Sequence, residues 1–240
     1  MIFYDLSFDS PIENLMCDDL LLKRAARGAG PDSVLRLWES PRVFVVLGIA
    51  GRVADDVYRA RCQRDRVEIL RRSSGGGTVL QGPGCLNFSF IYSRAENPSF
   101  QDLHRSYTAI LDPVIRVLRR LGVEAELCPV SDLALTATRK KISGNAQRRL
   151  KGHILHHGTI LYRFSCELIE RYLRFPKSVP DYRSGRSHRE FVVNIPIDVF
   201  SLRRALVEEF HPVTKVTRLN PDEQEEFQTL IAETSFRYRV

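Results

Sequence analysis

Two arginines and a run of glycines stand together in the segment RRSSGGGTV, residues 71–79. Glycine exposes backbone N–H groups and carries no side chain, so a ligand can come close to the main chain there. Arginine adds forked donors that suit phosphate or carboxylate groups. The segment is not a P-loop, because no Gly-Lys-Ser/Thr follows it, and it lacks the spacing of a dinucleotide-binding fingerprint. Taken alone, it fits an anion site or a plain glycine-rich hairpin loop.

A second polar segment, RKKISGNAQRR at residues 139–149, places a lysine shortly before a Ser-Gly pair. Lys141 would present a point charge to an anionic ligand, and Gly144 would let a strand edge approach that ligand closely. A solvated basic hairpin would contain the same residues, so this segment by itself does not decide between the two interpretations.

A third segment, HHGTIL at residues 156–161, contains two adjacent histidines. In a strand their side chains point to opposite faces. Adjacent residues rarely bind the same ion and no acidic cluster accompanies this pair, so we expect no metal site. One of the two histidines is expected to support the core or a neighbouring site residue.

The hydrophobic pattern predicts the elements that must hold these segments in place. Helical periodicity is expected between Pro11 and Gly28 and at residues 103–121, 166–175 and 197–211, with Pro113 kinking or breaking the second of these helices. Short apolar runs predict strands at residues 34–40, 43–49, 67–72, 85–93 and 153–164, with a turn at Pro41 between the first two. This mixed order predicts an α+β fold, a single domain with a mixed, largely antiparallel sheet flanked by helices.

Length and composition set limits on location and partners. The chain has 240 residues and a net charge of +7, with 43% hydrophobic and 27% charged residues, which is ordinary for a globular protein. No apolar run is long enough to span a bilayer and the start does not look like a signal peptide, so we expect a cytoplasmic protein without a membrane partner. The arginines are spread along the chain without a nucleic-acid-binding signature, so we expect no nucleic acid partner.

The five cysteines are odd in number and form no CxxC pair, which disfavours a disulfide framework and a zinc site. We expect most of these thiols to be reduced and structural. One of them could serve as a nucleophile.

The order and spacing of the three polar segments carry a resemblance that none of them carries alone. RRSSGGGTV followed by LNFSF, then SDLAL with KISGNAQRR, then HHGTIL resembles the lipoate–protein ligase A family, within the biotin/lipoate ligase and octanoyltransferase superfamily. The segment ENLMCDDLLL is similar to the first helix of that family. The resemblance covers roughly residues 10–210 and implies a biotin/lipoate ligase-like catalytic domain at 1–215, followed by a tail at 216–240 without an accessory domain.

The resemblance also implies a reaction. A lipoate–protein ligase transfers lipoate, through an acyl-adenylate made from ATP, to the lysine of a lipoyl domain in a 2-oxoacid dehydrogenase acyltransferase or glycine-cleavage H protein. ATP with Mg²⁺ would be a co-substrate, lipoate or octanoate the acyl substrate, and no permanently bound cofactor is expected. Lys141 would act in catalysis by binding acyl and phosphate oxygens, and Val79 and Leu86 could line a slot for the acyl chain. The other substrate- and ATP-binding residues implied are Arg72, Ser74, Gly75, Gly76, Gly77, Thr78, Val79, Ser143, Gly144, His157 and Gly158.

Two differences from the pattern of the ligases leave a second activity as an alternative. Gln81 and Gly82 occupy the positions where these ligases usually have a His-Asp pair, and the long ligases carry a further domain that would here be absent or lie on a separate accessory subunit. The alternative is a cysteine-dependent octanoyltransferase that uses octanoyl-acyl carrier protein, with Cys128 or, less favoured, Cys85 as nucleophile.

Two further interpretations remain at this stage. The basic segment PDYRSGRSHREF, residues 180–191, could close over the ligand, grip an acidic lipoyl domain or be a solvated loop. A remote alternative for the whole chain is a non-catalytic binding module with the same fold.

Overall fold

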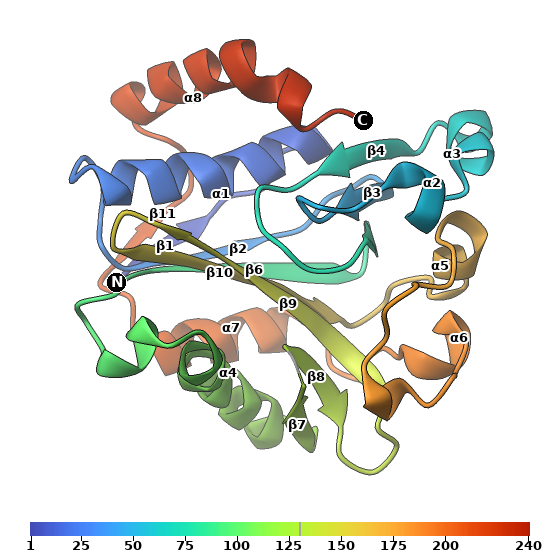
Figure 1. Cartoon of the computed structure of the whole chain (residues 1–240). Coiled ribbons are helices and arrows are strands. Elements are labelled where there is room, and N and C mark those ends of the chain that lie inside the picture. Colours follow the sequence, from blue (N-terminus) through green and yellow to red (C-terminus); the bar gives the residue numbers. More distant parts are fainter. Residues whose placement is uncertain (130) are drawn as a thin grey trace.

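The computed structural model describes residues 1–129 and 131–240, and its centre is an eight-stranded sheet (Figure 1). In spatial order the strands are β11 (Thr214–Val216), β1 (Ile2–Asp5), β2 (Val34–Trp38), β6 (Cys85–Ser93), β10 (His153–Leu161), β9 (Lys141–Leu150), β8 (Asp132–Leu135) and β7 (Ala125–Cys128). The pairs β11–β1 and β1–β2 are parallel and the others are antiparallel. The expected mixed, largely antiparallel sheet is confirmed.

A second sheet of three strands lies beside the first. It consists of β4 (Glu68–Arg71), β3 (Phe44–Leu47) and β5 (Val79–Gln81), with β3 parallel to β4 and antiparallel to β5. The turn expected at Pro41 therefore connects two sheets, because both edges of β2 are already occupied by β1 and β6. The glycine segment connects β4 to β5 within this second sheet.

Helices cover both faces of the large sheet (Figure 1). On one face, α4 (Leu103–Arg120) and α7 (Val199–Phe210) pack against strand residues such as Phe88 and Phe90. Of the kink or break expected at Pro113, the break does not occur, since α4 is one helix through that residue. Its buried residues Ile110 and Val114 keep the helix on the sheet despite the hydrogen bond that proline removes.

The opposite face of the sheet carries α1 (Pro11–Ala26), on which α8 (Pro221–Thr234) packs. Phe227 and Tyr238 of the C-terminal segment are buried in the same hydrophobic cluster as α1. The division into a domain and a tail stays a prediction, and the tail contributes to the core.

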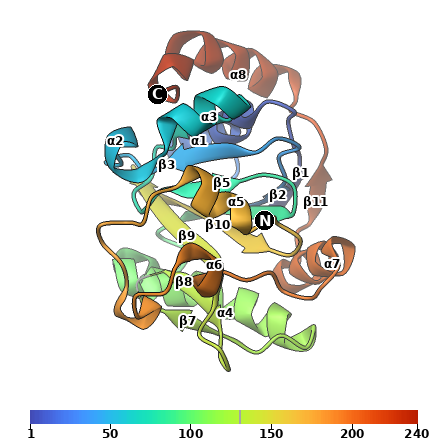
Figure 2. The same cartoon turned by 90° about the vertical axis from the view of Figure 1, so that its right-hand side faces the viewer.

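Short helices lie at the end of the molecule that carries the second sheet (Figure 2). They are α2 (Val53–Asp56), α3 (Arg59–Asp65), α5 (Glu167–Tyr172) and α6 (His188–Phe191). Val45 and Leu47 of β3 pack here against Cys62 and Ile169. Within the described ranges, no helix combines the length and apolar character that a membrane crossing requires.

Candidate active site

One cavity of about 880 Å³ brings the three polar segments together. Its walls come from the glycine segment and β5, from β9 and β10, and from residues 174–192. The predicted site residues that line it are Arg72, Gly76, Gly77, Thr78, Val79, Lys141, Ser143, Gly144, His157 and Gly158. Ser74, which is buried, and Gly75, which is exposed, are not part of the lining. Leu86, expected to line an acyl slot, lies instead in the core beneath α4 and α7, because successive residues of a strand face opposite sides.

The buried guanidinium of Arg72 holds the glycine loop, which we define as residues 72–77. Its Nε donates to Ser74 Oγ at 3.0 Å, and its Nη2 donates to the carbonyls of Gly75 at 2.5 Å and Gly77 at 2.9 Å. Burial lowers the pKa of Arg72 to about 10. Most of its donors thus bind its own loop and fix the backbone, while Arg72 also lines the cavity, and its direct contact with a ligand stays a prediction.

The glycines of this loop differ in what surrounds them. Gly76 has a φ of +88°, and a Cβ there would lie 2.8 Å from Arg72 Nη2. Apart from its chain neighbours, no atom of the described residues lies within 4 Å of a Cβ built on Gly75 or Gly77. Gly76 is therefore required by the fold of the loop, whereas Gly77 leaves open space beside the cavity. The next residue, Thr78, donates its hydroxyl to Asp56 Oδ2 at 2.8 Å.

Lys141 is positioned by two residues from other parts of the chain. Its Nζ lies 2.8 Å from Asp132 Oδ1, while the hydroxyl of Tyr182 donates to the second carboxylate oxygen of Asp132 at 2.7 Å. The lysine side chain is 24% exposed and lines the cavity. The site thus presents a held positive charge beside backbone amides, which suits a ligand in which negative charge develops.

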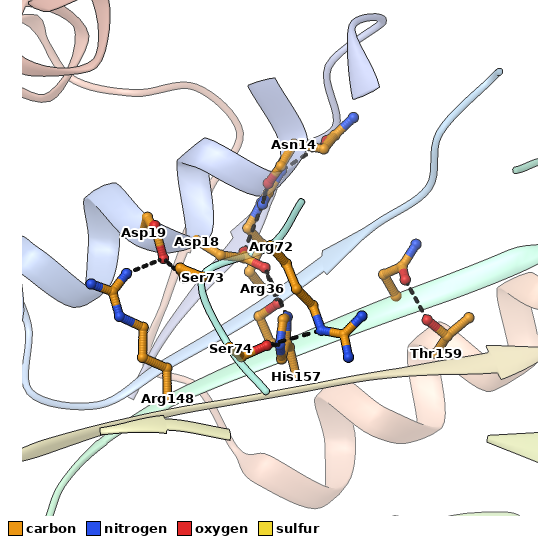
Figure 3. A network of polar contacts seen from close by, with 12 residues as sticks. Asn14, Asp18, Asp19, Arg36, Arg72, Ser73, Ser74, Arg148, His157 and Thr159 are labelled. Atoms are coloured by element: carbon orange, nitrogen blue, oxygen red, sulfur yellow. Dashed lines mark hydrogen bonds and ion pairs between the residues drawn. The ribbon is translucent and has the colours of Figure 1, made fainter. Parts of the chain in front are cut away.

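Ser74, His157 and Asp18 form a line that superficially resembles a nucleophilic triad (Figure 3). Ser74 Oγ lies 2.6 Å from His157 Nε2, but His157 Nδ1 is 3.9 Å from Asp18, which is beyond a hydrogen bond. Burial, with a further effect from Arg72, lowers the pKa of His157 to about 3. A histidine with so low a pKa is a poor general base near pH 7, and Ser74 is buried, so this arrangement is structural.

Asp18 instead belongs to a buried ion pair between α1 and β2 (Figure 3). Arg36 is fully buried and its Nη1 lies 2.7 Å from Asp18 Oδ1, while Ser89 donates to Asp18 Oδ2 at 2.7 Å. Burial raises the pKa of Asp18, and Arg36 opposes that shift. The pair fixes the helix beneath the glycine loop.

Several polar residues of the cavity were not assigned from the sequence. Gln81 Nε2 donates to Thr159 Oγ1 at 2.6 Å, and Thr159 donates to Asn87 Oδ1 at 2.6 Å. Asn145 donates to the Ser131 carbonyl at 2.7 Å and faces Gly158, where a Cβ would lie 1.8 Å from its Oδ1. Asp132 and Asn145 lie inside the motifs SDLAL and KISGNAQ, so polar residues within those motifs were the signal for both. Asn87 and Thr159 likewise lie inside the motifs LNFSF and HHGTIL, so the same signal was present for them.

The two cysteines considered as nucleophiles are fully buried. Burial raises the pKa of both Cys85 and Cys128. Among the described residues that line the cavity, neither thiol is present. This environment is that of structural cysteines, and the nucleophile role of Cys128 stays a prediction.

Residues 180–191 contribute a wall of the cavity through Arg183 and Phe191. The guanidinium of Arg183 lies over the rings of Phe175 and Phe191, at 4.4 and 4.8 Å from their centroids, and its Nε donates to the Arg186 carbonyl. The segment therefore forms part of one wall, and its arginine side chains donate to carbonyls of the chain itself. Its contact with an acidic partner stays a prediction. No cluster of three metal-ligating side chains occurs in residues 1–129 and 131–240.

Comparison with known proteins identifies relatives over most of the chain. The model of the lipoyl protein ligase A/B catalytic domain matches residues 10–211. Lipoate-protein ligase LplJ of Bacillus subtilis is 30% identical over 196 residues, covering 81% of this chain and 56% of the relative. Lipoate–protein ligase 1 of Staphylococcus aureus is 27% identical over 218 residues, covering 91% of this chain and 62% of the relative. Octanoyltransferase LipM of Carboxydothermus hydrogenoformans is 29% identical over 191 residues, covering 72% and 69%.

Solved structures share the fold. A bi-partite lipoate protein ligase from Thermoplasma acidophilum, described with its E2 lipoyl domain, has a TM-score of 0.79 at 23% identity and covers 98% of this chain and 92% of that chain. A lipoate-protein ligase A bound with ATP has the same TM-score at 22% identity, covering 98% and 95%. With the family model matching residues 10–211, the chain belongs to the lipoyl protein ligase A/B catalytic domain family.

Proposed function

We propose that this chain is a lipoate–protein ligase that activates lipoate with ATP and transfers the acyl group to the lysine of a lipoyl domain. Family membership supports acyl transfer of this type, and the names of the B. subtilis and S. aureus relatives support lipoate as the acyl group. The observation that carries the proposal is the cavity of about 880 Å³, which the glycine loop and Lys141 line together.

The first step joins two anions. A carboxylate oxygen of lipoate attacks the α-phosphorus of ATP and pyrophosphate leaves, so the site must supply positive charge and N–H donors. Lys141, held by Asp132, would supply the charge, and the exposed backbone of Gly76 and Gly77 would supply donors close to the phosphate. Leu15 and Val79 offer apolar lining for the acyl chain.

The second step needs no nucleophile from the enzyme. The amine of the acceptor lysine attacks the carbonyl of the mixed anhydride and loses a proton, while AMP leaves with the bonding electron pair. This fits the burial of Ser74, Cys85 and Cys128, the side chains that could otherwise act as nucleophiles. Mg²⁺ would enter with ATP, because it usually takes one or two carboxylates together with phosphate oxygens and water. Asp56 and Asp132 line the cavity and offer such carboxylates.

The same cavity admits octanoyl transfer as a second candidate, which the similarity to LipM favours. One experiment separates the two. The chain is mixed with an apo lipoyl domain and receives either lipoate, ATP and Mg²⁺, or octanoyl-acyl carrier protein without ATP. Pyrophosphate release reports adenylate formation, and the mass of the lipoyl domain reports acyl transfer. The two are measured separately, because the lack of a separate accessory subunit would limit only the step that this subunit serves.

The proposal predicts pyrophosphate release and lipoylated domain in the first mixture. Product only in the second mixture, abolished by Cys128→Ser, would establish the octanoyltransferase instead. Absence of both pyrophosphate release and acyl product in both mixtures would support a binding module of the same fold.

A further inference from the structure

Tyr238 connects the C-terminal segment to the start of the glycine loop. Its backbone carbonyl accepts from the N–H of Arg71 at 2.7 Å, and Leu70 forms an antiparallel bridge with Arg239. Its side chain is buried, with 7% of the residue exposed. The C-terminal end thus pairs with the end of β4, directly before the loop begins.

The hydroxyl of Tyr238 donates to Asp19 of α1, and Asp19 in turn holds the loop. Asp19 Oδ1 accepts from Ser73 Oγ at 2.5 Å and lies 2.8 Å from Arg148 Nη1 of β9, a cluster drawn in Figure 3. Asp19 is only 2% exposed, so its carboxylate depends on these donors rather than on water. Burial, followed by Asp19, raises the pKa of Tyr238, which keeps the phenol protonated as a donor.

The loop needs such anchors because its glycines are exposed and conformationally free. Arg72 and Ser74 fix its centre through the Gly75 carbonyl and His157, whereas Ser73 is its contact with α1. We propose that Tyr238 is a positioning residue for the glycine loop, acting through Asp19 and Ser73. Tyr238 lies outside the residues 10–211 that match the family model, and its effect on catalysis rests on the proposed function.

Removal of the phenol hydroxyl should raise the fraction of molecules in which the loop is not ready to bind. Binding then selects the ordered fraction, so the apparent affinity falls while turnover at saturation is preserved. For Tyr238→Phe we expect about a tenfold rise in the KM for ATP, the scale of one hydrogen bond to a charged group, with kcat within about twofold. Amides of residues 71–77 should exchange with solvent about tenfold faster in the unliganded chain.

Two further variants make the test specific. Phe236→Leu is the matched control, because Phe236 is 66% exposed and lies two residues before Tyr238; it should change neither quantity. Ser73→Ala removes the hydrogen bond between the loop and Asp19, the other half of the link from Tyr238. The double variant Ser73→Ala with Tyr238→Phe should therefore show the effect of the more affected single variant rather than the product of the two single effects.

Unchanged exchange in residues 71–77 of Tyr238→Phe would overturn the proposal. Equal acceleration throughout α1 and α8 would also overturn it, because the tyrosine would then serve general stability. So would a fall in kcat with an unchanged KM. Should the parent chain release no pyrophosphate, the proposed function fails, and the exchange comparison still decides the positioning role.

Discussion

The Nζ atom of Lys141 lies 2.8 Å from the Oδ1 atom of Asp132, where β8 and β9 shift register between Leu133 and Ala134. Asp132 pairs across the strands with Gly144, and a Cβ on Gly144 would lie 2.9 Å from the lysine Nζ. The missing side chain of Gly144 therefore makes room for the lysine itself. The positive charge of Lys141 is thus held at the cavity by three features: the glycine at position 144, the shift in strand register and the carboxylate of Asp132.

Lys141→Ala should reduce adenylate formation by about 10²–10³-fold, because a charge that stabilises the transition state is lost. The lysine is partly exposed, so the melting temperature should change by only about 3 °C or less. Asp132→Asn should have a smaller effect of about tenfold, since the positive charge remains and only its orientation suffers. Pyrophosphate release measures both variants. Lys140→Ala is the control. Normal turnover of Lys141→Ala would contradict the role of Lys141 in stabilising the transition state.

Gly77→Ala and Gly158→Ala should separate function from folding. Beyond its chain neighbours, the added methyl at Gly77 meets no atom of the described residues within 4 Å, so stability should be kept while the methyl obstructs close approach of a ligand to the backbone. At Gly158 it would lie 1.8 Å from Asn145 Oδ1 and 2.5 Å from Phe88 Cζ, and we expect a loss of about 3 kcal/mol in the free energy of unfolding.

Urea unfolding and pyrophosphate release, measured on both glycine variants, test this contrast. Full activity of Gly77→Ala would show that ligand and backbone do not meet at this position.

Stability should fall as the pH is lowered from 7 to 5. Burial, with a smaller effect of His157, lowers the pKa of His156 from 6.5 to about 3, so the unfolded chain binds a proton that the folded chain refuses in this range. At pH 5 this histidine alone removes about 2 kcal/mol from the free energy of unfolding. His156→Gln should flatten the pH dependence of the urea midpoint. Substitution of the exposed His104 by Gln should not, and equal slopes in all three proteins would refute the assignment.

Cys128→Ala and Cys85→Ala should keep lipoylation within about threefold, the scale of a small packing change, if no enzyme thiol is acylated. Burial raises the pKa of all three thiols, but Cys85 and Cys128 are fully buried whereas Cys166 is only half-buried, so iodoacetamide should react with them in the native chain more slowly than with Cys166. Mass spectrometry of labelled peptides gives the order. Rapid labelling of Cys128 together with loss of transfer in its variant would point to the octanoyl route.

The sequence predicted a large part of the fold because its signals are local. The apolar stripe of residues 103–121 predicted α4, and the apolar run at 85–93 predicted β6. Glycine, lysine and histidine motifs indicated which segments meet at the cavity, since close backbone approach and fixed charge require those residue types. The assignment of strands 34–40 and 43–49 to different sheets was not predictable, because it depends on which edges distant strands already occupy.

By itself the sequence determined which residue types are present: a glycine-rich segment whose backbone would suit an anion, a lysine in a second polar segment and the strands of a mixed sheet to carry them. Only the tertiary structure decided that Arg72 turns inward to its own loop, that Asp132 holds Lys141 and that Tyr238 reaches Asp19 across 219 positions of the chain. No local sequence pattern predicts such contacts. A buried charged group pairs with whichever donor or acceptor the folded chain brings within hydrogen-bond distance.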